Sequence, residues 1–511
     1  MGLDFVTFNA TFERAVSSTG FGRFHYVLLA LCGLIYLDTA IELTILSFVV
    51  PAAKCDFKMT SVDSGWLNAS PMLGMMVGCY FWGCLADLRG RKTVLIASLL
   101  VDGLSGLASS FSPYYPVFIV FRFIGGFGIT GAMSICFPYL GEFQPTKYRE
   151  KVLSWMELFW TAGVIALPLI AWAIIPLNFR FTSTYYTYAS WNLFVTLCSI
   201  PSLLLAFWMC FMPESPKFMI ECGEYDKALE VLKHMYAVNT GETPGSYPVR
   251  SLREKERGIS VTSIQSSRSL KSVRTVKDLQ LLMTDIWDMT KTLCKAPYRK
   301  YTLLTCIIQF GLTSGYYTLM MWFPELFNRY KAFETLHPGQ SASVCDVSSV
   351  FINSEDKCVA EISSSVYLNT LFIGLACIPT SLWLPLCVRR LGTKFFLVFC
   401  LLIAGVVATA FYFVQNSTQN LVLSCIFEAL TSLAISTIYC VMVDLFPTNL
   451  RVMAAALSMT FGRMGALLGN LVFGFLIDLD CVVPILLFAS FLYISGILCF
   501  FLPNTGRTEL E

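Results

Sequence analysis

Charged residues are scarce in this chain: they make up 14% of its 511 residues, against 56% that are hydrophobic. Soluble globular domains carry about a quarter charged residues, so this composition argues against a water-soluble protein. The net charge is only +2, which provides no broad basic field for a nucleic-acid partner. The composition therefore predicts a membrane protein whose main partner is the lipid bilayer.

Patterns that would indicate an enzyme or a metalloprotein are also missing. The three histidines (His25, His234 and His337) lie outside the apolar core of any long hydrophobic run, so we expect no metal site. No GxxxxGK[ST] phosphate-binding loop occurs, which argues against transport driven directly by ATP. No arrangement of residues suggests a catalytic nucleophile or a cofactor. We therefore expect a protein that is not an enzyme and needs no cofactor.

What the sequence has instead is a series of long apolar segments. A bilayer core of about 30 Å is crossed by roughly 20 mainly apolar helical residues. Twelve segments satisfy this requirement, at 24–50, 66–86, 93–112, 116–140, 152–176, 189–212, 301–327, 366–388, 394–414, 420–443, 452–478 and 482–502. The sequence therefore predicts an all-α membrane protein with twelve transmembrane helices.

The basic residues indicate how these helices are oriented. Of 36 Lys and Arg residues, 15 lie in the polar stretch between the sixth and seventh segments. Because cytoplasmic loops are enriched in Lys and Arg, we expect this loop and both termini to be cytoplasmic. Within the loop, residues 217–236 have apolar side chains at helical spacing and predict an amphipathic helix. The predicted organisation is a cytoplasmic segment 1–23, a six-helix half 24–212, a cytoplasmic loop 213–300, a second six-helix half 301–502 and a cytoplasmic tail 503–511.

Two outer loops carry candidate modification sites. Asn416 begins an Asn-Ser-Thr glycosylation signal in a short loop on the side expected to be non-cytoplasmic. Cys345 and Cys358 share the outer loop 329–362, where a disulfide and two free thiols stay open alternatives. Most of the 19 cysteines lie in apolar segments and are interpreted as small packing residues.

The two halves of the chain repeat each other. A shift of 302 positions aligns an acid, a proline, a threonine and an arginine without a gap. The aligned residues are Glu142, Pro145, Thr146 and Arg149 in the first half and Asp444, Pro447, Thr448 and Arg451 in the second. Two similar six-helix halves can rock about a site between them, which is a known plan of transporters. We therefore expect two pseudo-symmetric halves around a central binding site.

Specific motifs strengthen this prediction. Residues 83–92, GCLADLRGRK, resemble the signature loop between the second and third helices of the major facilitator superfamily. Residues 122–128, RFIGGFG, resemble the arginine-glycine motif of its fourth helix. Residues 213–217, PESPK, and 503–508, PNTGRT, are similar to the sugar-porter motifs after the sixth and twelfth helices, with Lys217 where Arg is usual and Asn504 where Glu is usual.

Within the superfamily, the branch of synaptic vesicle glycoprotein 2 and its relatives is the most similar. The residues that carry this resemblance are GFGRF at 20–24 and the segment after the sixth helix. The outer loop 329–362 is short, however, and no long repeat-rich outer domain like that of the mammalian vesicle glycoproteins is evident.

The resemblance implies a gate on the cytoplasmic side. The loop from Asp87 to Arg91 would hold the two halves together there until they move. The alternative is that these charges are solvated and only follow the positive-inside pattern, but their fixed spacing in both halves favours a gate. The expected gate residues are Asp87, Arg91, Glu142, Arg149, Glu214, Asp444 and Arg451.

Charged residues inside the apolar segments are the strongest functional candidates, because such charges are costly in a membrane. Asp38 and Glu42 are four positions apart and share one face of the first helix. Arg122 lies at a similar depth in the fourth. We expect Arg122 to pair with Glu42 and Asp38 to face the central cavity; the alternative is a purely structural ion pair. Glu157 and Arg463 are further buried charges, the second without an assignable partner.

Other candidates are polar-tipped and aromatic residues in the second half, types that commonly line solute pockets. These are Gln309, Tyr316, Tyr317, Trp322 and the buried acid Glu428. Lipid-facing or packing roles are the alternative for the aromatic residues.

Taken together, these features predict a secondary active transporter that moves a small organic solute by alternating access. An organic cation or a sugar-like molecule is the expected substrate, and a proton is a candidate coupled ion. The alternative is a membrane receptor or vesicle component, similar to synaptic vesicle glycoproteins, with little transport activity. We expect a monomer in the plasma membrane or in a vesicle or other internal membrane.

Overall fold

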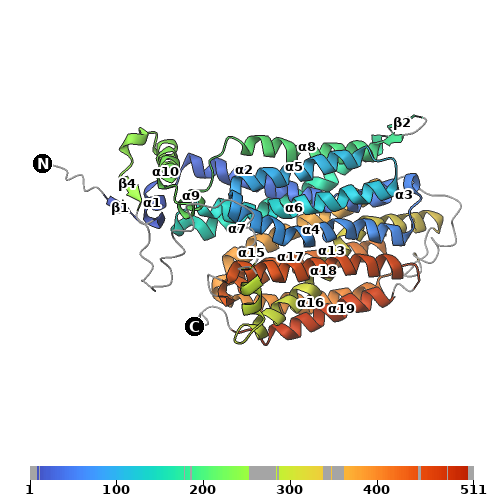
Figure 1. Ribbon diagram of the computed structural model, residues 1–511. Coiled ribbons are helices and arrows are strands. Elements are labelled where there is room, and N and C mark those ends of the chain that lie inside the picture. Colours follow the sequence, from blue (N-terminus) through green and yellow to red (C-terminus); the bar gives the residue numbers. More distant parts are fainter. Residues whose placement is uncertain are drawn as a thin grey trace.

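The computed structural model describes residues 8–10, 12–177, 179–183, 187–252, 284, 287–337, 347, 362–446, 450–479 and 482–503. Most of these residues are helical, and the long helices lie side by side in an elongated bundle (Figure 1). Within this part of the chain, twelve helical segments are long and apolar enough to span a membrane. The predicted all-α fold and the predicted number of spans are thereby confirmed.

The first half of the bundle, blue to green in Figure 1, contains six spans. They are formed by α2 (Arg23–Thr44) with its continuation α3 (Leu46–Phe57), α4 (Ser61–Arg89), α5 (Arg91–Ser110), α6 (Tyr115–Glu142), α7 (Thr146–Ile174) with the 3-10 turn η1 (Ile175–Leu177), and α8 (Ser190–Met209). A short antiparallel pair, β2 (Arg180–Thr182) and β3 (Thr187–Ala189), lies between α7 and α8. The first span extends past its predicted end at residue 50, because Lys54 finds an acidic partner in the second half.

The second half, yellow to red, lies below the first in Figure 1. Its helices are α13 (Arg299–Leu336), α15 (Ser364–Leu391), α16 (Thr393–Ala410) with the 3-10 turn η3 (Phe411–Phe413), α17 (Ser417–Leu445), α18 (Arg451–Leu476) and α19 (Val482–Cys499). Helix α13 is also longer than predicted. Glu325 and Arg329 interrupt its apolar run, but they pair with each other one helical turn apart and the helix continues.

One end of the bundle, here called the α10 end, carries a small extra layer (Figure 1). It contains α1 (Phe12–Ser18), α9 (Pro216–Glu221), α10 (Tyr225–Thr240), η2 (Pro244–Ser246), and the parallel strands β1 (Phe8–Ala10) and β4 (Val249–Leu252). Asn239 of α10 fixes this layer to the first span: its amide accepts from the Phe24 N–H at 3.0 Å and donates to the Thr19 carbonyl at 3.1 Å. The single amphipathic helix predicted for 217–236 is two helices, because the chain turns at Gly223 with a φ of 78°.

The two halves pack directly on each other at the opposite end, here called the α3 end. Helices α4 and α18 cross there, and α7 packs on α15 at the other edge of the interface. A Cβ atom on Gly65 would lie 2.8 Å from the Asn470 carbonyl oxygen and 3.1 Å from the Gly474 Cα atom. Only glycine allows the α4 and α18 backbones to approach this closely.

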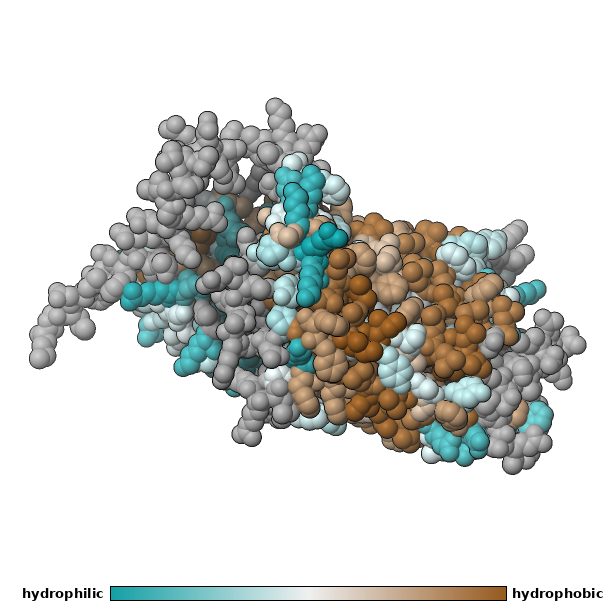
Figure 2. Space-filling view, turned by 90° about the horizontal axis from the view of Figure 1, so that it is seen from below, coloured by the Kyte–Doolittle hydropathy of each residue, from teal (hydrophilic) through white to brown (hydrophobic). Residues whose placement is uncertain are grey.

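The outer surface of the bundle is suited to lipid. Large apolar side chains point outward along the spans, including Phe207, Leu204 and Phe475, each more than half exposed. Figure 2 shows a broad hydrophobic surface over the middle of the bundle, with hydrophilic residues toward its ends. The chain is thus a multi-pass membrane protein.

Candidate functional site

A buried ion pair joins α2 to α6 inside the first half. The Arg122 Nη1 lies 3.3 Å from the Glu42 Oε2, and both side chains are at most 4% exposed. The guanidinium also donates to the hydroxyl of Ser109 and to the Gly106 carbonyl, while the Ser199 hydroxyl donates to the other Glu42 oxygen at 2.9 Å. These bonds satisfy most of the polar groups of the pair, which is the condition for a buried salt bridge to persist.

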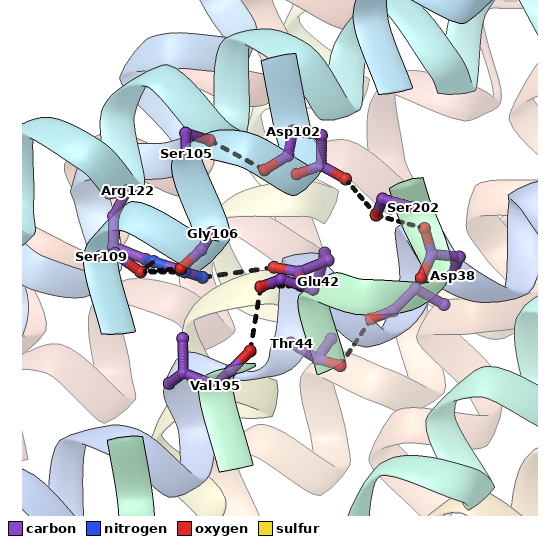
Figure 3. Close-up of polar contacts among 12 residues, drawn as sticks. Asp38, Glu42, Thr44, Asp102, Ser105, Gly106, Ser109, Arg122, Val195 and Ser202 are labelled. Atoms are coloured by element: carbon purple, nitrogen blue, oxygen red, sulfur yellow. Dashed lines mark hydrogen bonds and ion pairs between the residues drawn. The ribbon is translucent and has the colours of Figure 1, made fainter. Parts of the chain in front are cut away.

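A second pair of acids lies next to this ion pair (Figure 3). The Ser202 Oγ of α8 is 2.6 Å from the Asp38 Oδ2 and 3.0 Å from the Asp102 Oδ2, and all three residues are buried. A hydroxyl group has one hydrogen and can donate only one of these bonds. Both contacts can be hydrogen bonds only if one carboxyl group carries a proton and donates it to Ser202.

We call Asp38, Glu42, Asp102 and Arg122 the buried acid cluster. It sets three carboxyl groups against one guanidinium in a region with little access to water. Burying unpaired charge is costly, so protons are expected to bind here in place of the missing cations. The cluster therefore has the composition of a proton-binding site.

The expectation that Asp38 faces the central cavity is wrong. The four-residue spacing places Asp38 on the same face of α2 as Glu42, and this face points toward α5 and α8 of the same half. Asp102, which the sequence reasoning passed over, takes part instead. It could have been found by the criterion used for Asp38, because it is an acid in the middle of an apolar segment.

A central cavity lies between the two halves. Its lining comes from α2, α6 and α7 of the first half and from α13 and α17 of the second, with about 340 Å³ of empty space that includes its open side. The residues of the wall are Tyr36, Met133, Glu157, Trp160, Tyr316, Tyr317, Ser432, Ile435, Ser436 and Tyr439. The cavity thus combines five aromatic rings with one carboxylate, Glu157, beside which the Ser436 hydroxyl lies.

The second-half candidates divide between this cavity and the helix interfaces. Tyr316 and Tyr317 line the cavity, with ring centroids 4.8 Å apart. Glu428 is buried beside Tyr316 but does not line it. Gln309 packs against Gly462 of α18, and Trp322 packs on Phe473 with ring centroids 5.0 Å apart, so both belong to the contact between α13 and α18.

The predicted gate residues of the first half form a network at the α10 end. Arg91 lies 2.7 Å from Asp87 and 3.6 Å from Glu142. Glu214 accepts from the Lys92 N–H at 2.9 Å, and the Ser215 hydroxyl donates to Glu142.

These contacts join α4, α5, α6 and the segment after α8, so they connect helices of the first half to one another. That Asp87 and Arg91 also hold the two halves together stays a prediction, because the matching side chains of the second half lie outside the described residues. Arg149 contacts Glu13 at 3.2 Å and the Gly141 carbonyl at 3.0 Å. The side chains of Asp444 and Arg451 lie outside the described residues.

Charged residues do bridge the halves at the α3 end. Lys54 of α3 lies 3.0 Å from Glu325 of α13, and Arg329 lies 3.0 Å from Glu325 and 3.1 Å from Asp478. Arg329 also donates to the Ser61 hydroxyl of α4 at 2.8 Å. We call these five residues the α3-end ion cluster. Because Lys54 and Ser61 belong to the first half and the other three to the second, the cluster must break when this end opens.

The comparison with known proteins identifies the family. A family described as "Sugar (and other) transporter" matches residues 7–332, which is more than half of the chain. The chain belongs to this transporter family. Its relatives include synaptic vesicle glycoprotein 2C of mouse, 27% identical over 98% of this chain and 81% of the relative, and synaptic vesicle glycoprotein 2B of human, 26% identical over 98% and 86%.

Solved structures of sugar transporters have the same fold. The partially occluded inward-open xylose transporter XylE from E. coli superposes with a TM-score of 0.67 at 15% identity, covering 95% of this chain and 99% of the other. A D-xylose-proton symporter gives a TM-score of 0.65 at 16% identity and the same coverage. The chain is accordingly a major facilitator transporter related to synaptic vesicle glycoprotein 2, with a small-molecule substrate and no enzymatic role.

For this transporter the modification sites remain predictions. Asn416 is exposed and lies at the N-cap position of α17. Cys345 and Cys358 lie outside the described residues. Cys55, at the end of α3, is disulfide-bonded, which the sequence reasoning did not anticipate.

Proposed function

We propose that this protein is a secondary active transporter that carries a small organic solute through the central cavity by alternating access. The observation that supports this most directly is the cavity itself, because it lies at the interface of two six-helix halves and takes its wall from both. The α3-end ion cluster supports it further, since it closes the halves at one end by contacts that can separate. We also propose that the α10 end is cytoplasmic, as its basic residues suggest.

The cavity wall favours a substrate with a cationic group. Aromatic faces attract cations, and a carboxylate adds a direct electrostatic partner. Tyr36 and Trp160 lie 5.2 Å apart between ring centroids, on the same side of the cavity as Glu157. A sugar-like substrate is the second candidate, supported by the hydroxyl groups of Ser432 and Ser436 and by the fold shared with xylose transporters.

Replacing Glu157 with Gln separates these two candidates. In proteoliposomes, we expect the apparent affinity for organic cations to fall by about 10- to 100-fold, because a charge-assisted contact is lost. Uptake of a neutral sugar should change little. The exposed acid Asp226 of α10 supplies the matched control, Asp226→Asn, which should leave both unchanged. If E157Q leaves cation uptake unaltered, Glu157 is excluded as the partner of the cationic group.

The buried acid cluster is proposed to couple transport to protons. Replacing Asp102 with Asn keeps its shape and one acceptor but removes the exchangeable proton. We expect D102N to lose uptake driven by a proton gradient while exchange of solute between the two sides of the membrane continues. The measurement is tracer accumulation with and without an imposed pH gradient. Gradient-driven accumulation at the wild-type level in D102N would contradict proton coupling at this cluster.

A non-transporting role, as a receptor or vesicle component, remains the alternative because the similarity to synaptic vesicle glycoproteins covers 98% of the chain. Purified protein that moves no cation, sugar or carboxylate in liposomes, while a solute still stabilises it against heat, would favour this alternative.

A further inference from the structure

One charged residue near the central cavity has no acidic partner among the described residues. Arg463 of α18 is 5% exposed, and it takes part in none of the ion pairs found in that part of the chain. Its guanidinium lies 4.8 Å from the Tyr317 ring centroid, and its Nη2 is 3.3 Å from the Met133 sulfur. Its Nη1 is buried without a hydrogen-bond partner. Tyr317 and Met133 both line the cavity, so Arg463 lies directly behind this part of the wall, although it is not itself one of the wall residues.

This arrangement is costly unless something binds there. A buried guanidinium is normally paired, and its planar fork of N–H donors matches a carboxylate in particular. Tyr317 stabilises the charge partly, through its ring face and through a side-chain hydrogen bond, but Nη1 still has no acceptor. A carboxylate arriving from outside the chain would satisfy the unpaired donor.

The acid of the same cavity does not provide this carboxylate. Glu157 lies on α7 of the first half, whereas Arg463 lies on α18 of the second, and no ion pair described above joins them. The Ser436 hydroxyl is the polar group beside Glu157. The cavity therefore has a negative group on one half and a positive group next to its wall on the other.

We propose that the central cavity binds a zwitterion, a small amino acid-like molecule whose ammonium group contacts Glu157 and whose carboxylate contacts Arg463. This inference rests on the proposed function, because it assigns the substrate class of the same cavity. A zwitterion would also connect the two halves, whereas a simple cation would have a charged partner on only one.

Matched probes test the proposal in thermal-shift measurements on the purified full-length protein. The probes are ω-amino acids of increasing chain length, such as γ-aminobutyrate and δ-aminovalerate, each compared with the amine and the carboxylic acid of the same carbon chain. A bound solute stabilises the folded protein by mass action. We expect one amino acid to stabilise the wild type at concentrations at which neither of its matched compounds does.

Variants then assign the two contacts. Arg463→Gln should weaken the binding of that amino acid by about 10- to 100-fold and leave the binding of the matched amine unchanged. Glu157→Gln should weaken the binding of the amino acid by a similar factor and leave the binding of the matched carboxylic acid unchanged. Arg463→Lys should retain part of the affinity for the amino acid, because lysine keeps the positive charge but lacks the two parallel N–H donors of the guanidinium. If the Arg463 variants do not fold, competition by the amine and by the acid against the amino acid in the wild type still tests both contacts.

The outcomes distinguish this inference from the function on which it rests. If an amine stabilises the wild type as well as every amino acid does, the zwitterion is excluded while a cation transporter stands. If R463Q leaves the amino acid response intact, the proposed contact of the carboxylate with Arg463 is excluded. If no amine, amino acid, acid or sugar is bound or transported, the proposed function fails as well.

Discussion

Arg122→Gln is expected to lower the free energy of unfolding by about 3–5 kcal/mol, because it leaves the Glu42 carboxylate buried without its counter-charge. The amide of Gln would lie near the position of the Arg122 Nε, which is 3.2 Å from the Ser109 hydroxyl, so the loss reports mainly on the charge. The effect should appear as a large drop in the melting temperature of the purified protein in detergent. Transport should fall together with the folded fraction.

The double variant separates the ion pair from its surroundings. Glu42→Gln together with Arg122→Gln removes both charges, so it should be more stable than Arg122→Gln alone. Lys227→Gln is the matched control, because Lys227 belongs to an exposed pair with Glu224 on α10 and such pairs contribute about 1 kcal/mol or less. Equal losses for Arg122→Gln and Lys227→Gln would show that the buried pair does not stabilise the fold.

Arg329→Gln is expected to open the α3 end. The change removes contacts to Glu325, Asp478 and Ser61 in a single step, and Glu325 keeps only Lys54. If these contacts contribute about 3 kcal/mol to the closed state, its population relative to the open state falls by about 100-fold. A cysteine at Asn470, which is buried where α4 meets α18, should then react faster with a membrane-impermeant thiol reagent.

A neighbouring ion pair provides the control for this experiment. Lys331 and Glu334 pair on the same helix at 3.2 Å, but both side chains are about 40% exposed and neither reaches the first half. Lys331→Gln should therefore leave the labelling rate unchanged. A labelling rate in Arg329→Gln equal to that of Lys331→Gln would show that the α3-end ion cluster does not hold this end closed.

The sequence predicted the fold well because two strong physical signals carry it. Hydrocarbon thickness sets the length of each apolar run, and the gap-free match of Glu142 and Arg149 with Asp444 and Arg451 reveals the duplication. Errors arose where polar residues extend a helix. Lys54 and Arg329 were interpreted as loop charges, whereas each lies in a helix and is neutralised by a residue distant in sequence.

The candidate site was predicted less completely, because its geometry depends on contacts between distant helices. The cost of charge in a membrane correctly drew attention to Glu42 and Arg122, which the structure places together. The same rule could not show that Asp38 and Asp102 lie close together. They are connected through the Ser202 hydroxyl, and serine is too common in apolar helices to indicate such a contact. The cavity wall combines residues from five helices, and no local pattern indicates which aromatic side chains meet there.

The glycine contact between α4 and α18 lies where it can act as a pivot when the two helices tilt relative to each other. Gly65 is the fifth residue of a 29-residue helix, so its contact with Gly474 lies close to one end, and contacts farther along, such as that of Tyr80 with Thr460, would have to separate as the helices tilt about it. At 1.5 Å per residue, the arm from Gly65 to Arg89 is about 36 Å long, and a tilt of about 10° would move its tip by about 6 Å. The short arm would move by only about 1 Å. Small adjustments among the charges at the α3 end would thus be amplified into a wide displacement at the α10 end.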